Sequence, residues 1–500
     1  MFQLKRILWS GMYLMVVVFL VAATVNVSAQ QVKAEPGKYR AFWVNAFQPD
    51  MHTPQGVARA VKVARDYNFN TIIAEVRLQC DAFYNSTVEP KSPLVQPPDY
   101  DPLKDMCAQA HDTTDGKQRL EVHAWIVTYR ANLNMNNVPI GTGTPAHVLT
   151  QHPTWINQNF KGETVSGNKN FLDPGVPGVI DHTVAVVKDI VQNYDVDGIH
   201  YDYIRYPEED TSGACDWGYN PISVNRFNRI YDRKGSPETG DPDWENFRRQ
   251  QILDLLRKTY VEAKRIKPTI KMSASTVNWG PCPDDFKQSA PYKRTLQDWV
   301  SFMKEGVLDI NFLMNYKREH DAGQAADYRA WSKLVASSKS GRHGVVGQGA
   351  YLNDPQGTVA QMKFDLSLPE IDGTALYCYS EARREADTKI VPDPLIFDPI
   401  KNEIFTTPVD PPVAEWIVNP TKGICAGTVK VGKEPADRAI VTLSPGGKQT
   451  HTDGTGFYAF MDVEPGDYQL KAKPLAGKET SEKTQCAKGQ IAIKDITCKP

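Results

Sequence analysis

The stretch that decides the fold class is a run of alternating polar and apolar residues, Val196-Asp197-Gly198-Ile199-His200-Tyr201-Asp202-Tyr203-Ile204-Arg205-Tyr206-Pro207. Because successive side chains of a strand point to opposite faces, Gly198, His200 and Asp202 share one face. We expect this face to line a barrel, with Asp202 at the rim, His200 one layer down and Gly198 making space below. Asp197, at the start of the strand, is predicted to pin its bottom end.

Seven more short runs of the same kind precede and follow this one, and amphipathic helical stretches lie between them. Strands that are buried on both faces and separated by helices are typical of parallel βαβ units. Eight such units predict an α/β fold, a (β/α)8 TIM barrel over residues 38–405. The absence of a GxGxxG motif after the first run argues against a dinucleotide-binding fold. The eight runs are Arg40–Ala46, Thr71–Leu78, Leu120–Tyr129, Val196–Ile204, Lys271–Val277, Leu308–Tyr316, Gly344–Leu352 and Gly373–Ser380.

The N-terminus carries the pattern of a secretory signal peptide, predicted over residues 1–29. Lys5 and Arg6 precede an apolar run from Ile7 to Val25, and small residues lead to a cleavage site at Ala29. An uncleaved membrane anchor is the alternative, because the run approaches the length that spans a bilayer. The favoured prediction is a secreted or periplasmic protein without stable membrane insertion.

Beyond a Pro-rich linker at 406–420, short alternating strands predict a small all-β sandwich over 421–500. The stretch Thr452–Phe460, followed by Pro465-Gly466-Asp467-Tyr468, resembles the carboxypeptidase-regulatory-like family. The resemblance implies a β-sandwich and says little about activity. Two roles stay open, a wall- or sugar-binding module and a spacer, and the spacer is slightly favoured.

Composition excludes several classes of function. The formal net charge of −2, without a basic block, makes nucleic acid a poor partner. The eight cysteines form no CxxC pair, so no structural metal cluster is expected. In an exported chain their even number suggests disulfides, and Cys215 with Cys282 could staple the barrel rim. No GxSxG or HExxH motif supports a serine hydrolase or a metal site, and no cofactor is predicted.

Catalytic side chains of TIM barrels project from the C-terminal ends of the strands, and Asp202 occupies that position. The alternative is a structural aspartate paired with Arg205 or Arg77. Glycoside hydrolysis normally requires a second carboxyl group. The candidates for it are Glu75, Asp81, Glu381 and the loop pair Asp284 and Asp285.

Other polar and aromatic residues at strand ends are predicted to bind substrate, since aromatic rings stack on sugars and polar side chains hold their hydroxyl groups. Glu75 and Arg77 are predicted to share the inward face of the second strand. Individually, residues such as His123, Trp125 and Tyr316 could equally be core residues. The full set of predicted substrate-binding residues is Arg77, Tyr84, His123, Trp125, Tyr129, Arg130, His200, Arg205, Asn315, Tyr316 and Tyr379.

Several blocks across residues 38–390 resemble the glycosyl hydrolase-like 10 family: Arg40-Ala41-Phe42-Trp43-Val44, Val76-Arg77, Asp81-Ala82-Phe83-Tyr84, His123-Ala124-Trp125, Tyr129-Arg130, Leu172-Asp173-Pro174-Gly175 and Asp197–Tyr203. The resemblance implies an exported bacterial barrel that cleaves peptidoglycan glycan strands. The chain differs from many relatives in having Tyr203 in place of a second aspartate and Glu75 in place of glutamine. Its fifth strand, Ser273–Thr276, lacks a proline-glycine pattern.

The sequence therefore predicts an exported glycosidase that acts on a polysaccharide, with cell-wall glycan as the expected substrate. Asp202 is expected to act as nucleophile or base, kept ionised by Arg77 or Arg205. A catalytically inactive, sugar-binding barrel that anchors or senses cell-wall glycan is the alternative. An enzyme for plant or algal polysaccharide is a third possibility.

Overall fold

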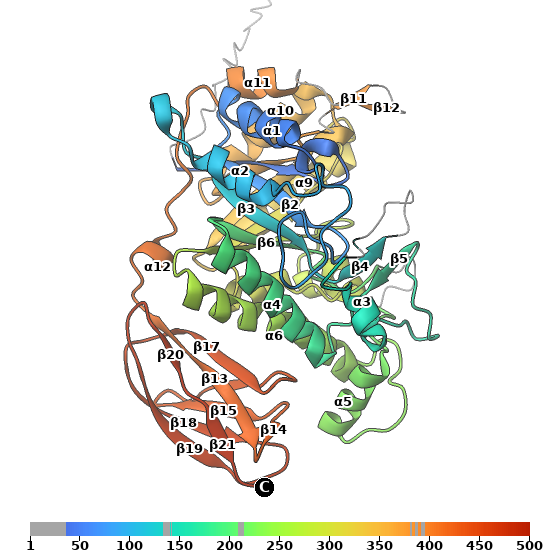
Figure 1. Ribbon diagram of the computed structural model, residues 1–500, viewed down its shortest axis with the longest axis vertical. Helices are drawn as coiled ribbons and strands as arrows, with labels where there is room; N and C mark the ends of the chain where they lie inside the picture. The colour runs from blue at the N-terminus through green and yellow to red at the C-terminus, as the bar shows by residue number, and fades with distance from the viewer. Residues whose placement is uncertain are drawn as a thin grey trace, which may run out of the picture. The chain divides into compact units, whose positions relative to one another are not determined.

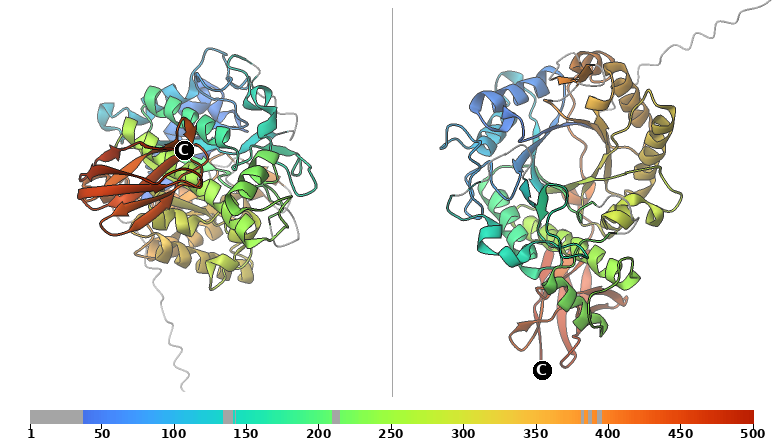
Figure 2. Two further views of the ribbon diagram at one scale, coloured as in Figure 1. Left: turned by 90° about the horizontal axis from the view of Figure 1, so that it is seen from below. Right: turned by 90° about the vertical axis from the view of Figure 1, so that its right-hand side faces the viewer.

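The computed structural model describes residues 37–133, 141, 143–208, 215–380, 383–385, 389–391 and 396–500. Eight of the described strands are parallel and close into a barrel in the order β1-β10-β9-β8-β7-β6-β3-β2. Figure 2 shows these strands as a ring with the helices outside it. The predicted TIM barrel is confirmed, and each predicted run overlaps one of its strands. The strands are β1 (Tyr39–Val44), β2 (Thr71–Arg77), β3 (Glu121–Val127), β6 (Gly198–Asp202), β7 (Lys271–Thr276), β8 (Ile310–Met314), β9 (His343–Gly349) and β10 (Gly373–Tyr377).

Helices lie between the strands along the chain (Figure 1), and many of them begin at a side-chain cap. The Asp241 carboxylate, for example, accepts hydrogen bonds from the N–H groups of Asp243 and Trp244, and Pro242 occupies the first helical position. Both features favour the start of a helix. The helices are α1 (Pro54–Asp66), α2 (Pro102–His111), α3 (Val148–Gln151), α4 (Pro177–Asn193), α5 (Pro221–Tyr231), α6 (Pro242–Ile266), α7 (Ala290–Arg294), α8 (Trp299–Glu305), α9 (Ala322–Ser338), α10 (Pro355–Ser367), α11 (Phe397–Glu403) and α12 (Glu415–Val418).

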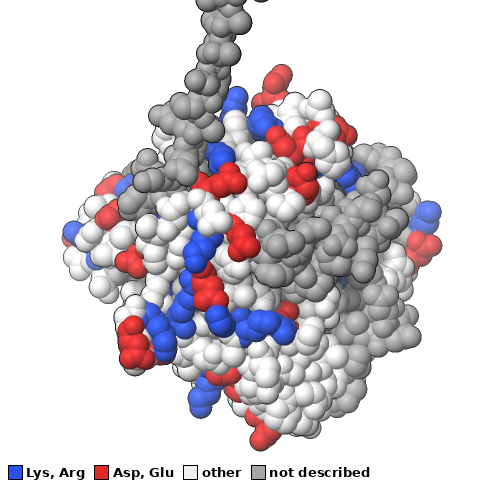
Figure 3. Space-filling model, turned by 90° about the horizontal axis from the view of Figure 1, so that it is seen from above, with Lys and Arg blue, Asp and Glu red and all other residues white. Residues whose placement is uncertain are grey.

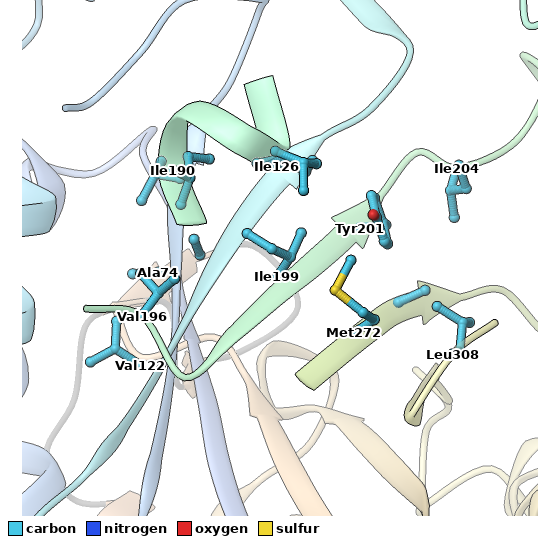
Figure 4. Packing of buried hydrophobic residues seen from close by; sticks show 14 of the residues in the cluster. Ala74, Val122, Ile126, Ile190, Val196, Ile199, Tyr201, Ile204, Met272 and Leu308 are labelled. Carbon is cyan, nitrogen blue, oxygen red and sulfur yellow. The ribbon is translucent and has the colours of Figure 1, made fainter. Parts of the chain in front are cut away.

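Strand β6 separates an apolar outer face from a polar inner one. On the outer face, Ile199 and Tyr201 lie in the apolar layer that also contains Ile190 of α4 (Figure 4). The Tyr201 hydroxyl donates to Thr259 Oγ1 of α6 at 2.7 Å. Each apolar side chain buried in this layer contributes roughly 1.5–3 kcal/mol. The layer therefore fixes which face of β6 turns inward.

On the inner face, His200 lies in the barrel core. Its Nδ1 is 2.9 Å from Ser273 Oγ and its Nε2 is 2.8 Å from Ser275 Oγ. The Trp43 indole N–H points to the same Nε2 at 3.2 Å. Burial lowers the pKa of His200 well below its usual range, so the ring is neutral. The predicted inward face is confirmed, with His200 as a satisfied core residue.

Asp197 pins the bottom of β6, as predicted. Its carboxylate accepts the Val122 N–H at 2.8 Å and pairs with Arg119 and His111 at 2.7 and 2.9 Å. The N-terminal end of β6 is thereby tied to β3 and to α2. Asp197 therefore lies at the N-terminal face of the barrel, where residues stabilise the fold. The catalytic residues of TIM barrels lie at the opposite, C-terminal face.

Short pairs of strands accompany the barrel. β4 (Arg130–Leu133) and β5 (Lys169–Phe171) form one antiparallel pair, and β11 (Arg383–Glu385) and β12 (Lys389–Val391) form another. None of them was predicted.

The C-terminal residues form two β-sheets that enclose their own core. That core includes Val429 and Phe460 from one sheet and Leu443 and Leu470 from the other. One sheet contains β13 (Gly423–Val431), β14 (Glu434–Pro435), β17 (Phe457–Val463), β20 (Ile491–Ile493) and β21 (Ile496–Cys498). The other contains β15 (Ile440–Ser444), β16 (Lys448–His451), β18 (Gly466–Lys473) and β19 (Thr480–Cys486). The all-β nature of this segment is confirmed.

All eight cysteines lie in the described part of the chain, and none of them is joined to another in a disulfide. The expected disulfide between Cys215 and Cys282 is therefore not present. Cys215 is buried with its thiol directed to the Trp217 carbonyl, whereas Cys282 is half-buried in the loop after β7. Cys282 has its own carbonyl contact, to Pro283.

Charged side chains of both signs lie among one another on the face drawn in Figure 3. This distribution agrees with the formal net charge of −2. Among the helices that the structure describes, none combines the length and the hydropathy needed to cross a bilayer.

Gly198 leaves room for the His123 ring, and this close approach yields a stability prediction. A Cβ atom at Gly198 would lie 2.7 Å from His123 Nδ1, deep in the barrel. We expect Gly198→Ala to lower the free energy of unfolding by about 1–3 kcal/mol through overpacking. Urea denaturation measures the change. Gly143→Ala is the matched control, because a Cβ there meets open space. Equal stability of the two variants would contradict the assignment of Gly198 to the packed interior.

Candidate active site

A cleft of about 440 Å³ opens at the C-terminal end of the barrel strands. Asp202 ends β6 and lies in its wall, so the strand that decides the fold also reaches the cleft. The C-terminal face is where TIM barrels carry their reactive groups. The lining residues are Trp125, Asp202, Tyr203, Arg205, Val277, Asn278, Trp279, Met314, Tyr316, Lys317, Tyr351 and Tyr377.

Asp202 is held in place through both its backbone and its side chain. Its carbonyl accepts the Thr128 N–H at 2.7 Å, which ties the end of β6 to β3. Its Oδ1 accepts the N–H of Tyr203 at 2.7 Å. Tyr203 has a φ of +49°, in the left-handed region that residues other than glycine seldom occupy. Such strained positions cluster at functional sites, where the surrounding structure maintains them.

Burial dominates the electrostatics of Asp202, which is only 7% exposed. Burial raises the pKa of its carboxyl, although Arg205, the Tyr203 N–H, Arg130 and the Trp125 side chain all act to lower it. Within the described residues, Asp202 makes no ion pair with Arg205 or Arg77. A raised pKa means that the carboxyl holds its proton to a higher pH than an exposed aspartate does. Arg205 lowers the pKa of Asp202, as predicted, but burial outweighs it and the net shift is upward.

Two arginines lie over the ring of Tyr203, beside Asp202. The guanidinium carbons of Arg130 and Arg205 are 4.6 and 4.5 Å from its centroid. Arg205 also lies 4.9 Å from the Trp279 ring centroid. Cations over aromatic faces are attracted by the ring quadrupole. The rings thus hold both guanidinium groups close to Asp202 without neutralising their charge.

Glu75 lies behind the cleft wall and does not line it. Its Oε2 accepts the Ala46 N–H at 2.7 Å, and its Oε1 is 3.8 Å from Arg130 Nη2. Burial raises the pKa of Glu75 to about 8, against the opposing effects of Arg130 and the Ala46 N–H; the nearby charges of Asp202 and Asp81 add to the rise. Glu75 thus holds its proton to a higher pH than an exposed glutamate does, and Arg130 lies between it and Tyr203.

Arg77 does not share the inward face with Glu75, which corrects the sequence prediction. The β2–β3 register shifts between these two residues, and such a bulge turns the following side chain. Arg77 is fully buried, and its Nε and Nη2 each bond Glu89 at 2.7 Å. Its Nη1 donates to the carbonyls of Val127 and Thr128. With its donors occupied, Arg77 is a structural residue that has no contact with the cleft.

Most other predicted site residues also lie outside the cleft. Asp81 is buried where its Oδ1 accepts the Gln79 N–H at 3.1 Å, and burial raises its pKa. Asp284 and Asp285 are exposed, and Asp285 caps a short 3-10 helix. Glu381 lies outside the described residues. The remaining predicted residues that the structure places in the core or against helices are Tyr84, His123, Tyr129, His200, Asn315 and Tyr379.

The structure brings together Trp125, Arg205 and Tyr316 with Asp202, as predicted, and Arg130 lies next to them. The prediction missed Lys317 and several rings: Trp279, Tyr203, Tyr351 and Tyr377. Trp279 and Lys317 follow the fifth and sixth strands by a few residues. Extending the search from the strand ends into the first loop residues would have found both.

The raised pKa of Glu75 yields a prediction about stability and pH. A carboxyl whose pKa is higher in the folded state stabilises the fold at low pH, and this contribution is lost as pH rises from about 4.5 to about 8. The Glu75→Gln variant has no carboxyl at this position, so it does not undergo this decrease in stability. We expect the unfolding free energy of the variant, relative to wild type, to increase from pH 5 to pH 8 by up to about 1.4 kcal/mol per pH unit.

Urea titrations at four pH values measure this difference. Glu403→Gln is the control: a hydrogen bond from Lys363 lowers the pKa of Glu403, so its contribution changes little above pH 5 and its difference from wild type stays nearly flat. A flat difference for Glu75→Gln would show that Glu75 is ionised in the folded protein.

Comparison with known proteins assigns the family. Residues 38–346 match the profile of the Glycosyl hydrolase-like 10 family, and the chain belongs to this family. It is similar to the protein named glycosyl hydrolase DigH of Escherichia coli K12, with 28% identity over 341 residues, 62% of this chain and 71% of that protein. It is also similar to glycosyl hydrolase YngK of Bacillus subtilis, with 25% identity over 376 residues, 70% of this chain and 66% of that protein.

A solved structure shows the same fold. The PgaB (BpsB) glycoside hydrolase domain from Bordetella bronchiseptica superposes with a TM-score of 0.51 at 13% identity, covering 68% of this chain and 94% of that domain. At this identity the similarity concerns the barrel architecture alone.

Proposed function

We propose that this protein is an exported glycoside hydrolase that cleaves glycosidic bonds in a polysaccharide, with bacterial cell-wall glycan as the substrate. The observation that carries the proposal is the buried Asp202 carboxyl in an aromatic-lined cleft at the C-terminal face of the barrel. Membership in a glycosyl hydrolase-like family supports the reaction class. The signal-like N-terminal sequence supports export.

The cleft walls suit a sugar chain. Trp125, Trp279, Tyr316, Tyr351 and Tyr377 line them, and large rings with a polar tip offer apolar faces beside hydrogen-bonding groups. A site that is largely apolar with a few convergent polar groups is the usual form of a ligand pocket. Sugar rings, with alternating apolar faces and hydroxyl edges, match both features.

We assign proton donation to Asp202. A glycosidase acid protonates the leaving oxygen, and its pKa is raised by a drier site. Burial raises the pKa of Asp202 despite two neighbouring guanidinium groups. This assignment differs from the sequence-based expectation of an ionised nucleophile or base, and the upward shift of the Asp202 pKa supports it.

The alternative function is a sugar-binding barrel without turnover. It is favoured by one observation: among the described side chains that line the cleft, Asp202 is the single carboxyl, whereas glycosidases normally use two. Glu75 lies behind the wall, and Glu381 lies outside the described residues. A hydrolase releases products from the glycan, whereas a sugar-binding barrel binds the same glycan and releases none.

Asp202→Asn tests the proposed reaction. We expect it to reduce product release from purified peptidoglycan glycan strands by at least about 100-fold while binding is retained, because the amide cannot donate the proton. The loss should be much smaller on an aryl glycoside with an acidic phenol leaving group, which needs no protonation. Reducing-end assays measure turnover, and calorimetry measures binding.

Asp197→Asn is the matched control, because Asp197 lies at the opposite end of the same strand. It should lower stability and leave turnover of the folded protein near the wild-type value. Wild-type binding without turnover on cell-wall, plant and algal glycans would establish the sugar-binding alternative. Unchanged turnover of Asp202→Asn would refute the assigned role.

A further inference from the structure

The described side chains at the cleft include more cations than carboxyl groups. Among its described lining side chains, Asp202 is the one carboxyl, and Arg205 and Lys317 are two cations. Arg130 adds a third cation beside Tyr203, 3.8 Å from the buried Glu75 carboxyl, whose pKa burial raises to about 8. The site therefore carries excess positive charge where a substrate would lie. Buried charges are costly unless a partner or a ligand compensates them.

Arg205 is the cation of this group that lines the cleft and also lies against two aromatic rings. It is only 6% exposed, and its Nε is buried without a hydrogen-bond partner among the described residues. Its guanidinium lies over the Tyr203 and Trp279 rings, 4.5 and 4.9 Å from their centroids. These rings hold the guanidinium in place, and no described carboxylate forms an ion pair with it. A group held in this way is prepared for an incoming anion, because little side-chain freedom is lost on binding.

Lys317 supplies a second cation from another strand end. It follows β8 and is 9% exposed. Its Nζ donates to the carbonyls of Asn278 and Gly280 at 3.2 and 3.3 Å. These two bonds orient the ammonium group without neutralising it, since a carbonyl carries no net charge. No described carboxylate forms an ion pair with Lys317, so its charge also remains for a ligand.

We propose that Arg205 and Lys317 form a subsite that binds a carboxylate substituent on a sugar of the glycan, and that this subsite restricts the substrate to acidic polysaccharides. The proposal deepens the proposed function and rests on it. A guanidinium presents a planar fork of donors that matches a carboxylate, and Lys317 adds a point charge. The same carboxylate chemistry occurs in lactyl ethers of amino sugars and in uronic acids.

Binding to the full-length Asp202→Asn protein tests the subsite without interference from turnover. The probes are peptidoglycan glycan strands, the same strands after carboxyl reduction, oligomers of uronic acid, and chitin oligosaccharides. We expect the acidic strands to bind about 10- to 100-fold more tightly than their reduced counterparts, the range for hydrogen bonds to a charged group. Comparison of the lactyl and uronic probes identifies the source of the carboxylate.

Arg205→Gln and Lys317→Met, each added to Asp202→Asn, should abolish most of this preference and leave the affinity for reduced strands little changed. Arg205→Lys should retain only part of it, because a lysine lacks the fork. Arg329→Gln is the matched control: Arg329 pairs with Glu319 on the α9 side of the barrel and is not a lining residue. If Arg205→Gln fails to fold by circular dichroism, Lys317→Met and Arg205→Lys decide the result.

Equal affinity for acidic and reduced strands, or a preference that survives both Arg205→Gln and Lys317→Met, would overturn the subsite. Different results would refute the proposed hydrolase and the proposed subsite. Wild-type hydrolysis of acidic and reduced strands at equal rates would leave the hydrolase and remove the subsite. A carboxylate preference without wild-type turnover would leave the subsite and remove the hydrolase.

Discussion

The cleft depends on the burial of one carboxyl group beside two guanidinium groups that do not pair with it. Asp202 lies at the end of β6, and its position is set by the strand pairing of the barrel and by the Thr128 and Tyr203 N–H groups. Desolvation raises its pKa, and the arginines counter this only in part. If Arg205 paired directly with Asp202, the carboxyl would be a poor acid and the guanidinium would be unavailable to a ligand. Both proposed roles therefore rest on this separation.

Aromatic rings hold the guanidinium groups of Arg130 and Arg205 so that neither forms an ion pair with the Asp202 carboxyl. Tyr203 holds Arg130 and Arg205, and Trp279 holds Arg205 from a neighbouring loop. The attraction of a cation to a ring restrains the guanidinium without consuming its hydrogen-bond donors. An aspartate in place of Tyr203 would offer the arginines a carboxylate partner. The tyrosine keeps their charge in the cleft.

The barrel, the inward face of β6 and the role of Asp197 could be predicted because period-two alternation and strand–helix order are local properties of the sequence. The site could be predicted only in part. The bulge that turns Arg77 away from Glu75 has no signature in the sequence, and the partner that it meets, Glu89, comes from a loop. Trp279 and Lys317 were missed because they lie in loops beyond the strands, and Tyr203 was missed because strict alternation places it on the outward face, whereas its φ of +49° departs from a strand. Whether Asp202 is protonated could not be predicted, because it depends on burial and on charges from several elements.

The central claim is that the Asp202 carboxyl protonates the leaving oxygen of a glycosidic bond. The most direct measurement is a structure of Asp202→Asn with an oligosaccharide that spans the cleft. The account predicts that a side-chain atom of residue 202 lies about 2.6–3.2 Å from a glycosidic oxygen, with sugar rings against Trp125 or Trp279. An oligosaccharide bound in the cleft with all its glycosidic oxygens out of reach of residue 202 would contradict it.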